Sequence, residues 1–134
     1  MNPRSKYPIH QSPFFKLTTK RRLYELLGVG SGELKKFASD INYRVWEEDG
    51  REIQAPKKKL KALHARIKDL LSRIETPAWL MSGQRGKSYL TNAEAHHASD
   101  YLLNVDITGF YKNTSRERVY QCFIHMFKMS HDLT

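Results

Sequence analysis

The chain has 134 residues, 40% of them hydrophobic, which is enough for one modest domain with a core. Its 23 Lys and Arg against 14 Asp and Glu give a net charge of +9, which favours nucleic acid, then an anionic membrane, over a merely soluble basic surface. A single cysteine, Cys122, excludes an internal disulfide framework and a cysteine-rich zinc site. Without a long apolar run, we expect no membrane span and no signal peptide, and hence a cytoplasmic protein.

The first elements in chain order are an extended arm and a short helix. Residues 1–17 begin with a proline-rich stretch that predicts an arm lying on another surface. The following stretch predicts a helix that is capped by Thr18 or Thr19 and ended by Gly28. Three leucines form its apolar side: Leu23, Leu26 and Leu27.

A second short helix and a hairpin come next. The helix is expected to run from Ser31, as N-cap, to about Ser39. An Asp-Gly pair at 49–50 then lies between two alternating runs, which is a strong hairpin signal. We expect strands near 42–47 and 51–55.

The stretch 57–75 predicts the longest helix, with one apolar stripe and a basic remainder. Lys57, Lys58, Lys59 and Lys61 open it, where cations oppose the helix dipole. This arrangement favours a nucleic-acid phosphate backbone bound close to the lysines. The alternative is that the lysines form a charged face exposed to solvent. The stripe consists of Leu60, Leu63, Ile67, Leu70, Leu71 and Ile74.

The last part of the chain predicts a glycine-containing basic loop, a short helix from Thr91, a strand over 101–106 and a final helix from Ser115. We expect the Cys122 side chain, on that helix, to pack in the core of the domain. Since an apolar strand needs neighbours to pair with, the chain reads as the front part of a larger α+β domain. The inward residues of the last helix are expected to be Val119, Phe123, Met126 and Phe127.

Four stretches together resemble one family, the prokaryotic reverse transcriptases, most closely the retron type, with the group II intron enzymes as relatives. "INYRVWEEDGREIQAP" resembles their fingers hairpin, and "KKKLKALHARIKDLL" the helix that follows it. "SGQRGKSYLTNAEAHH" resembles a retron pattern, and "YLLNVDITGFYKNTSRERV" resembles polymerase motif A. The chain looks like the N-terminal part of such an enzyme.

The resemblance implies a partial right-hand polymerase fold: helices, a fingers β-hairpin, and the first palm strand and helix. It divides the chain into an N-terminal extended arm over 1–17, a fingers-like region over 18–98, and the start of an incomplete palm with motif A over 99–134.

The resemblance makes Asp106 a catalytic carboxylate and metal ligand, with the backbone carbonyl of Ile107 facing the same ion. Two Mg²⁺ ions serve nucleotidyl transfer in the complete enzyme, and we expect this chain alone to bind Mg²⁺ weakly or not at all. From the residues alone, Asp106 could instead cap a turn or the next helix.

The resemblance also implies a dNTP site. Arg51, with Arg44 second, would hold the triphosphate, and both are expected to face each other across the hairpin. The backbone amides of Gly109 and Phe110 would lie near the triphosphate, and Tyr111 would act as the steric gate. The alternatives are solvated arginines that pair with Glu47, Glu48 or Glu52, and paired aromatics in a core.

The implied macromolecular partners are an RNA template and a DNA primer, with a structured noncoding RNA as template in the retron type and anti-phage defence as the common role. Arg85, Lys87 and His96 are expected to contact nucleic acid, as are the lysines of 57–61. His96 and its neighbour His97 lack a metal-ligand spacing.

The chain departs from the family in one respect. It contains no Asp-Asp, and hence no Tyr-x-Asp-Asp, so it holds one of three expected carboxylates. We expect it to be inactive alone, as a fragment or a degenerate member. The alternatives are a non-catalytic basic RNA- or DNA-binding module and a structural fragment that self-associates through an exposed sheet edge.

Overall fold

The computed structural model describes residues 5–133, which form two compact units. Unit 1 comprises residues 5–75 and 117–133, and unit 2 comprises residues 76–116. Helices and one two-stranded antiparallel sheet make up the described chain, which confirms the α+β class. No helix among the described residues is long and apolar enough to cross a membrane.

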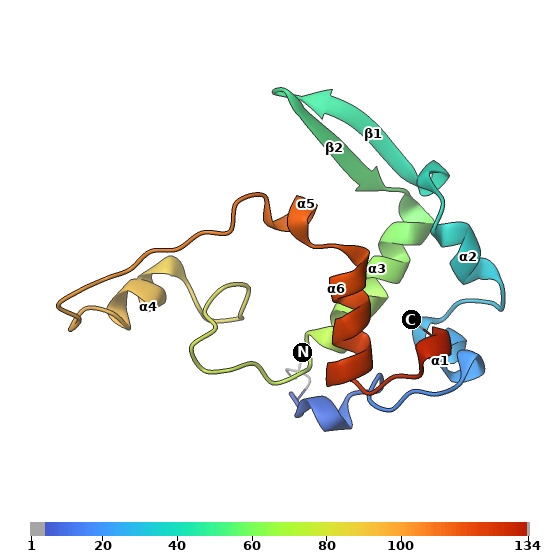
Figure 1. Cartoon of the computed structure of the whole chain (residues 1–134), viewed down its shortest axis with the longest axis horizontal. Helices are drawn as coiled ribbons and strands as arrows, with labels where there is room; N and C mark the ends of the chain where they lie inside the picture. The colour runs from blue at the N-terminus through green and yellow to red at the C-terminus, as the bar shows by residue number, and fades with distance from the viewer. Residues whose placement is uncertain (1–4, 134) are drawn as a thin grey trace. The chain divides into compact units, whose positions relative to one another are not determined.

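The elements are labelled in Figure 1. The α-helices and strands are α1 (Lys20–Leu27), α2 (Glu33–Phe37), β1 (Tyr43–Glu48), β2 (Arg51–Pro56), α3 (Lys58–Leu71), α4 (Tyr89–Glu94), α5 (Phe110–Asn113) and α6 (Arg116–Gln121). Three 3₁₀ turns span Ile9–Gln11, Asp40–Asn42 and His131–Leu133, and a π-helical turn spans Cys122–Met126.

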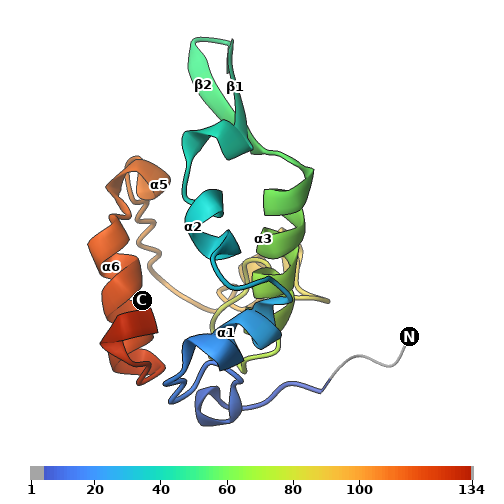
Figure 2. The ribbon, with the colours of Figure 1, turned by 90° about the vertical axis from the view of Figure 1, so that its right-hand side faces the viewer.

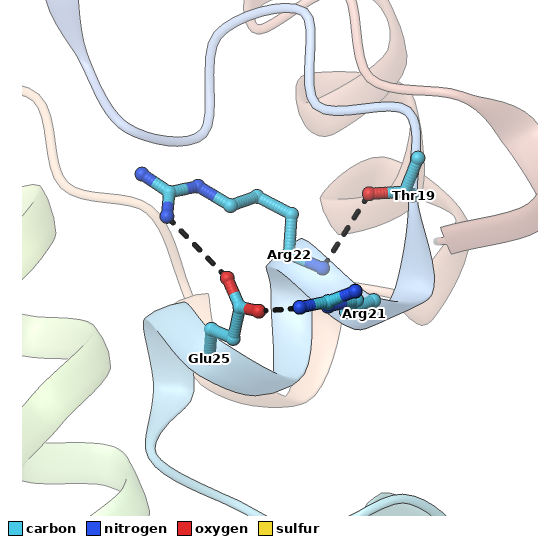
Figure 3. Close-up of polar contacts among 4 residues, drawn as sticks. All are labelled: Thr19, Arg21, Arg22 and Glu25. Atoms are coloured by element: carbon cyan, nitrogen blue, oxygen red, sulfur yellow. Dashed lines mark hydrogen bonds and ion pairs between the residues drawn. The ribbon is translucent and has the colours of Figure 1, made fainter.

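Helix α1 follows its local sequence signals. Thr19 Oγ1 accepts a hydrogen bond from the Arg22 backbone N–H at 3.4 Å, which confirms the N-cap (Figure 3). Gly28 ends the helix in the left-handed region, with φ +68°. The three predicted leucines are buried.

Helix α2 begins differently from the expectation. Gly32, and not Ser31, precedes the helix, and its φ of +82° turns the chain into the first turn. The Glu33 carboxylate accepts the N–H of Gly30, before the helix, at 2.6 Å, and no side chain caps the first turn. The helix also ends at Phe37, before Ser39.

The hairpin is confirmed within one residue of its predicted bounds. Asp49 and Gly50 both have positive φ, +50° and +70°, as a type I′ turn requires. The turn fixes the register so that Glu48 lies opposite Arg51 and Tyr43 lies opposite Pro56. Figures 1 and 2 show the hairpin projecting beyond α2 and α3 of the same unit.

Helix α3 supplies the central apolar stripe of unit 1. Leu60, Leu63 and Leu70 are buried, and the other three predicted stripe residues pack against them half-buried. Arg66 Nε donates to the Leu26 carbonyl at 2.9 Å, which ties α3 to the C-terminal turn of α1. The amphipathic prediction for this helix is therefore confirmed.

Residues near the two ends of the described chain close the core of unit 1. Phe14 is 3% exposed and meets the ring of Phe127 edge-on at 6.1 Å. Lys16 N–H donates to the Phe127 carbonyl at 2.8 Å, and Ser130 N–H donates to the Leu17 carbonyl at 3.0 Å. Residues 5–17 thus belong to the packed part of unit 1.

Tyr7 joins that segment to the end of α3. Its backbone N–H donates to the Arg73 carbonyl at 2.9 Å, and its carbonyl accepts the Glu75 N–H at 2.8 Å. The Arg73 guanidinium lies 4.9 Å from the centre of the Tyr7 ring. Residues 1–4 of the predicted arm lie outside the described residues.

The strand predicted over 101–106 is not formed. Residues 101–107 are irregular, and their apolar side chains are exposed, with Tyr101 at 94% and Leu103 at 90%. A strand gains its backbone hydrogen bonds from a neighbour, and the described part of unit 2 contains no other strand.

Two helix predictions need correction. Helix α4 begins at Tyr89, before Thr91, because Ser88 and Thr91 form a reciprocal capping box. Val119 in α6 and Met126 in the π-helical turn are 47% and 57% exposed, so the inward positions predicted for them are wrong. The π-helical turn changes the helical phase after α6, which removes Met126 from the predicted inward face. Phe127 is buried and Phe123 half-buried as predicted, and Cys122 packs against the same core half-buried.

Candidate nucleotide and nucleic-acid interface

The register of the hairpin decides which side chains share a face. Side chains alternate along a strand, and directly opposite residues lie on the same face. One face, called here the tryptophan face, therefore carries Arg44, Trp46, Glu48, Arg51, Ile53 and Ala55.

The two arginines share the tryptophan face, but they do not face each other. Arg44 lies opposite Ala55, and Arg51 lies opposite Glu48 next to the turn. The expectation of a direct pairing was wrong because the two-residue turn places the arginines at opposite ends of the hairpin.

The two arginine side chains do not form the ion pairs with hairpin glutamates that were the alternative to ligand binding. Both are exposed, and neither side chain forms a hydrogen bond or ion pair within the described residues. Glu48 instead accepts the indole N–H of Trp46 at 3.4 Å, and Glu52 accepts the amide of Gln54 at 2.6 Å. The guanidinium groups are thus available to an external anion.

The tryptophan face also contains a residue that the motifs do not single out. Trp46 lies between the arginines and is 43% exposed. The period-two pattern in "RVWEE" together with the Asp-Gly turn was the signal that places it there.

The lysines at the start of α3 lie directly after the hairpin. Lys57, Lys58, Lys59 and Lys61 are all exposed, and the first turn of α3 has neither an acidic residue nor a side-chain cap. The Lys57 N–H donates to the Asn42 carbonyl at 2.7 Å, so the base of the hairpin and the lysine cluster are held together.

Asp106 lies in an exposed irregular segment of unit 2, and a turn at Thr108 and Gly109 follows it. Gly109, with φ +60°, starts α5. Asn113 Nδ2 donates to the Thr108 carbonyl at 2.8 Å, and Thr114 Oγ1 donates to the Phe110 carbonyl at 2.7 Å. Asp106 takes no part in these bonds. Within the described residues it therefore does not cap the turn or the next helix, which was the alternative to a metal ligand.

The aromatic pair after this turn is exposed. Phe110 and Tyr111 are 53% and 89% exposed, and their rings meet edge-on at 5.3 Å. Neither ring belongs to the core cluster of the described residues. The backbone carbonyl of Ile107 and the amide of Gly109 lie in the same irregular stretch.

The other predicted nucleic-acid contacts also lie in unit 2. Arg85 and Lys87 are exposed in a loop whose turns are made by Gly83 and Gly86, with φ +67° and +78°. His96 is exposed just after α4. Unit 2 therefore carries these three residues and the Asp106 segment, while unit 1 carries the arginines and the lysines.

The described residues do not by themselves fit a two-ion magnesium site. No group of three or more His, Cys, Asp or Glu side chains within residues 5–133 is arranged to hold a metal ion. Asp106 is a lone exposed carboxylate, whereas protein-bound Mg²⁺ is held by carboxylates together with phosphate oxygens and waters.

No protein-family model matches the chain, and no solved structure matches it. Among curated proteins, the Retron Se72 reverse transcriptase of Salmonella heidelberg is 31% identical over 85 residues, which cover 63% of this chain and 22% of that protein. The Retron Ec86 reverse transcriptase of Escherichia coli is 24% identical over 95 residues, 65% of this chain and 30% of that protein. The chain thus spans less than a third of these relatives, and it is related to a part of the retron-type reverse transcriptases.

Proposed function

We propose that this chain supplies the fingers and motif A segment of an RNA-directed DNA polymerase that extends a primer with dNTPs. The partial relationship to two retron reverse transcriptases supports the proposal. The observation that carries it within the chain is Asp106, a carboxylate that follows an apolar segment, precedes an exposed aromatic pair and has no partner within the described residues.

The proposed dNTP contacts are two arginines, two backbone amides and one aromatic ring. Arg51 and Arg44 bind the triphosphate, and their lack of ion pairs within the described residues supports this role. The backbone amides of Gly109 and Phe110 assist, and Tyr111 excludes a 2′-hydroxyl. Asp106 and the Ile107 carbonyl would hold Mg²⁺ only together with carboxylates from outside the described residues.

We propose an RNA template, a DNA primer and, as template source, a structured noncoding RNA. The exposed lysines Lys57, Lys58, Lys59 and Lys61 contact its backbone, and so do Arg85, Lys87 and His96. The net charge of +9 supports a polyanionic partner. We place the protein in the cytoplasm with a role in anti-phage defence, and we expect this chain alone to be inactive.

The test is primer extension on an RNA template with this chain mixed with a retron reverse transcriptase segment that carries Tyr-x-Asp-Asp. We expect Asp106→Asn to lower the extension rate by at least about 100-fold, since mutations at groups that stabilise a transition state have effects of that size. Asp100→Asn, at an exposed carboxylate of the same unit, is the matched control and should change little. Full extension by the Asp106→Asn mixture would contradict the proposal.

A second candidate is a non-catalytic RNA- or DNA-binding module. The absence of a carboxylate cluster within residues 5–133, beside exposed lysines, favours it. It predicts salt-sensitive RNA binding that Asp106→Ala leaves unchanged, and no extension in any mixture. Self-association through the hairpin edges is a further property we propose, and it predicts a mass by light scattering that rises with protein concentration.

A further inference from the structure

The tryptophan face combines an exposed aromatic ring with two unpaired cations. Trp46 is 43% exposed, and no aromatic or cation–π contact engages its ring within the described residues. Arg44 is its neighbour on the same strand face, and Arg51 lies on that face toward the turn. A flat apolar surface flanked by guanidinium groups suits a nucleobase flanked by phosphates.

The opposite face of the hairpin has the opposite character. Glu47 lies directly across from Glu52, and like charges in that position destabilise a strand pair and repel a polyanion. Val45, 55% exposed, is an apolar residue on that side. The tryptophan face carries two arginines against one carboxylate, Glu48, so the difference in charge directs a nucleic acid to that face.

The lysine cluster extends this face toward the helices. Strand β2 ends at Pro56 and α3 begins two residues later, at Lys58. Arg44 lies opposite Ala55, so the arginine is near the end of β2 that leads into the lysines. Cations thus occur at both ends of the hairpin, with an aromatic ring between the two arginines.

We propose that, when no dNTP occupies it, the tryptophan face binds unpaired nucleotides of single-stranded RNA, with Trp46 stacked on a base and the two arginines on flanking phosphates. The inference rests on the proposed function for RNA as the partner. Base stacking needs an exposed base face, which a duplex hides. The face therefore distinguishes unpaired from paired RNA, whereas the lysines bind either form.

The first experiment uses the fluorescence of Trp46 in the full chain. The chain has two tryptophans, so Trp79→Phe leaves Trp46 as the sole tryptophan, whose emission is excited separately from that of the tyrosines. We expect quenching when this variant is titrated with a single-stranded oligouridine RNA of about 12 nucleotides, within the usual site size of single-strand binders. An RNA duplex of equal length should bind without comparable quenching.

The second experiment compares affinities for the same single strand. Trp46→Ala should weaken binding by at least about five-fold, which is the lower end of the effect of one stacked base. Trp46→Phe should retain most of the affinity because it keeps a ring. Val45→Ala removes an exposed apolar side chain from the opposite face and should have no effect. Circular dichroism of each variant checks that the fold is intact.

Salt dependence separates stacking from charge. Log affinity falls as log salt concentration rises. Arg44→Gln should make this slope less steep by about one, because one phosphate contact is lost. Trp46→Ala should weaken binding while it leaves that slope unchanged.

Three results would overturn the inference: no loss of affinity in Trp46→Ala, an equal loss in Val45→Ala, or quenching by a free dNTP without quenching by RNA. In the first two results, RNA binding by the wild-type chain leaves the proposed function intact. Failure of the proposed function shows separately, in the Asp106→Asn primer extension.

Discussion

At the scale of single residues, the charged groups of unit 1 fall into two kinds. Arg66 is used internally, because its guanidinium closes the end of α1. Arg44 and Arg51 are exposed and lack such partners within the described residues. Sequence composition counts all of these as equal positive charges, and the contacts separate structural arginines from those available to a ligand.

Glu25 provides a prediction on pH at this scale. The hydrogen bond from Arg21, at 3.1 Å, is the largest cause of the lowered pKa of the Glu25 carboxyl (Figure 3). Desolvation opposes it, and the hydrogen bond from Arg22, at 3.5 Å, lowers the pKa further. A lowered pKa in the folded state stabilises the fold above the ordinary carboxyl pKa, and this contribution is lost as pH falls through the lowered value.

We therefore expect Glu25→Gln to lower the thermal unfolding midpoint slightly at pH 7 and to have no effect well below the ordinary carboxyl pKa. The effect is small because the pair is exposed and screened by solvent. Unfolding midpoints measured across this pH range, with Glu75→Gln as the matched exposed control, check it. An equal effect of Glu25→Gln at both ends of the range would be inconsistent with the prediction.

At the scale of elements, local signals account for α1, the hairpin and α3. A side-chain cap, an Asp-Gly turn and an apolar stripe each act within a few residues, so they appear in the sequence. Where local signals compete, the outcome was less predictable, as at α2, where Gly32 precedes the helix and no side chain caps it.

Thr19→Ala tests the α1 cap. Loss of the Oγ1 acceptor leaves the Arg22 N–H without its side-chain partner, which should lower the free energy of unfolding by about 1 kcal/mol. Thr18→Ala is the control, because Thr18 is exposed and does not cap the helix. Urea denaturation followed by circular dichroism measures both variants. Equal losses would mean that the cap contributes nothing specific.

At the scale of the whole molecule, the core belongs to one unit. Every residue of the core cluster lies in unit 1, including the aromatic residues of its two chain segments that are distant in sequence. Unit 2 contributes no buried residue to that cluster. Hydrophobic burial, the main source of stability, is therefore independent of residues 76–116.

Replacing residues 76–116 with a flexible Gly-Ser linker long enough to join Glu75 to Glu117 should leave unit 1 folded, with a similar cooperative unfolding transition. Removing residues 123–133 should instead abolish that transition, because Phe127 and Met129 are buried against the core. Thermal scans by circular dichroism distinguish the variants. Loss of cooperativity in the linker variant would show that unit 2 is required for folding.

The sequence by itself determined the α+β class, the hairpin with its turn, the stripe of α3 and the family to which the chain is partly related. The two-residue turn fixes the strand register. The register in turn decides on which face of the hairpin Trp46 lies and how far Arg44 is from Arg51. These features depend on interactions between residues that are close in sequence, or on motifs that are read directly.

Only the tertiary structure decided the rest. The 101–106 segment has strong β propensity, yet a strand forms only against a neighbour, and the described part of unit 2 offers none. The closure of Phe14 and Leu17 onto Phe127 and Met129 joins residues more than a hundred positions apart, which no local pattern encodes. Long-range pairing and packing depend on which partner surfaces are present, and that information lies in the folded chain.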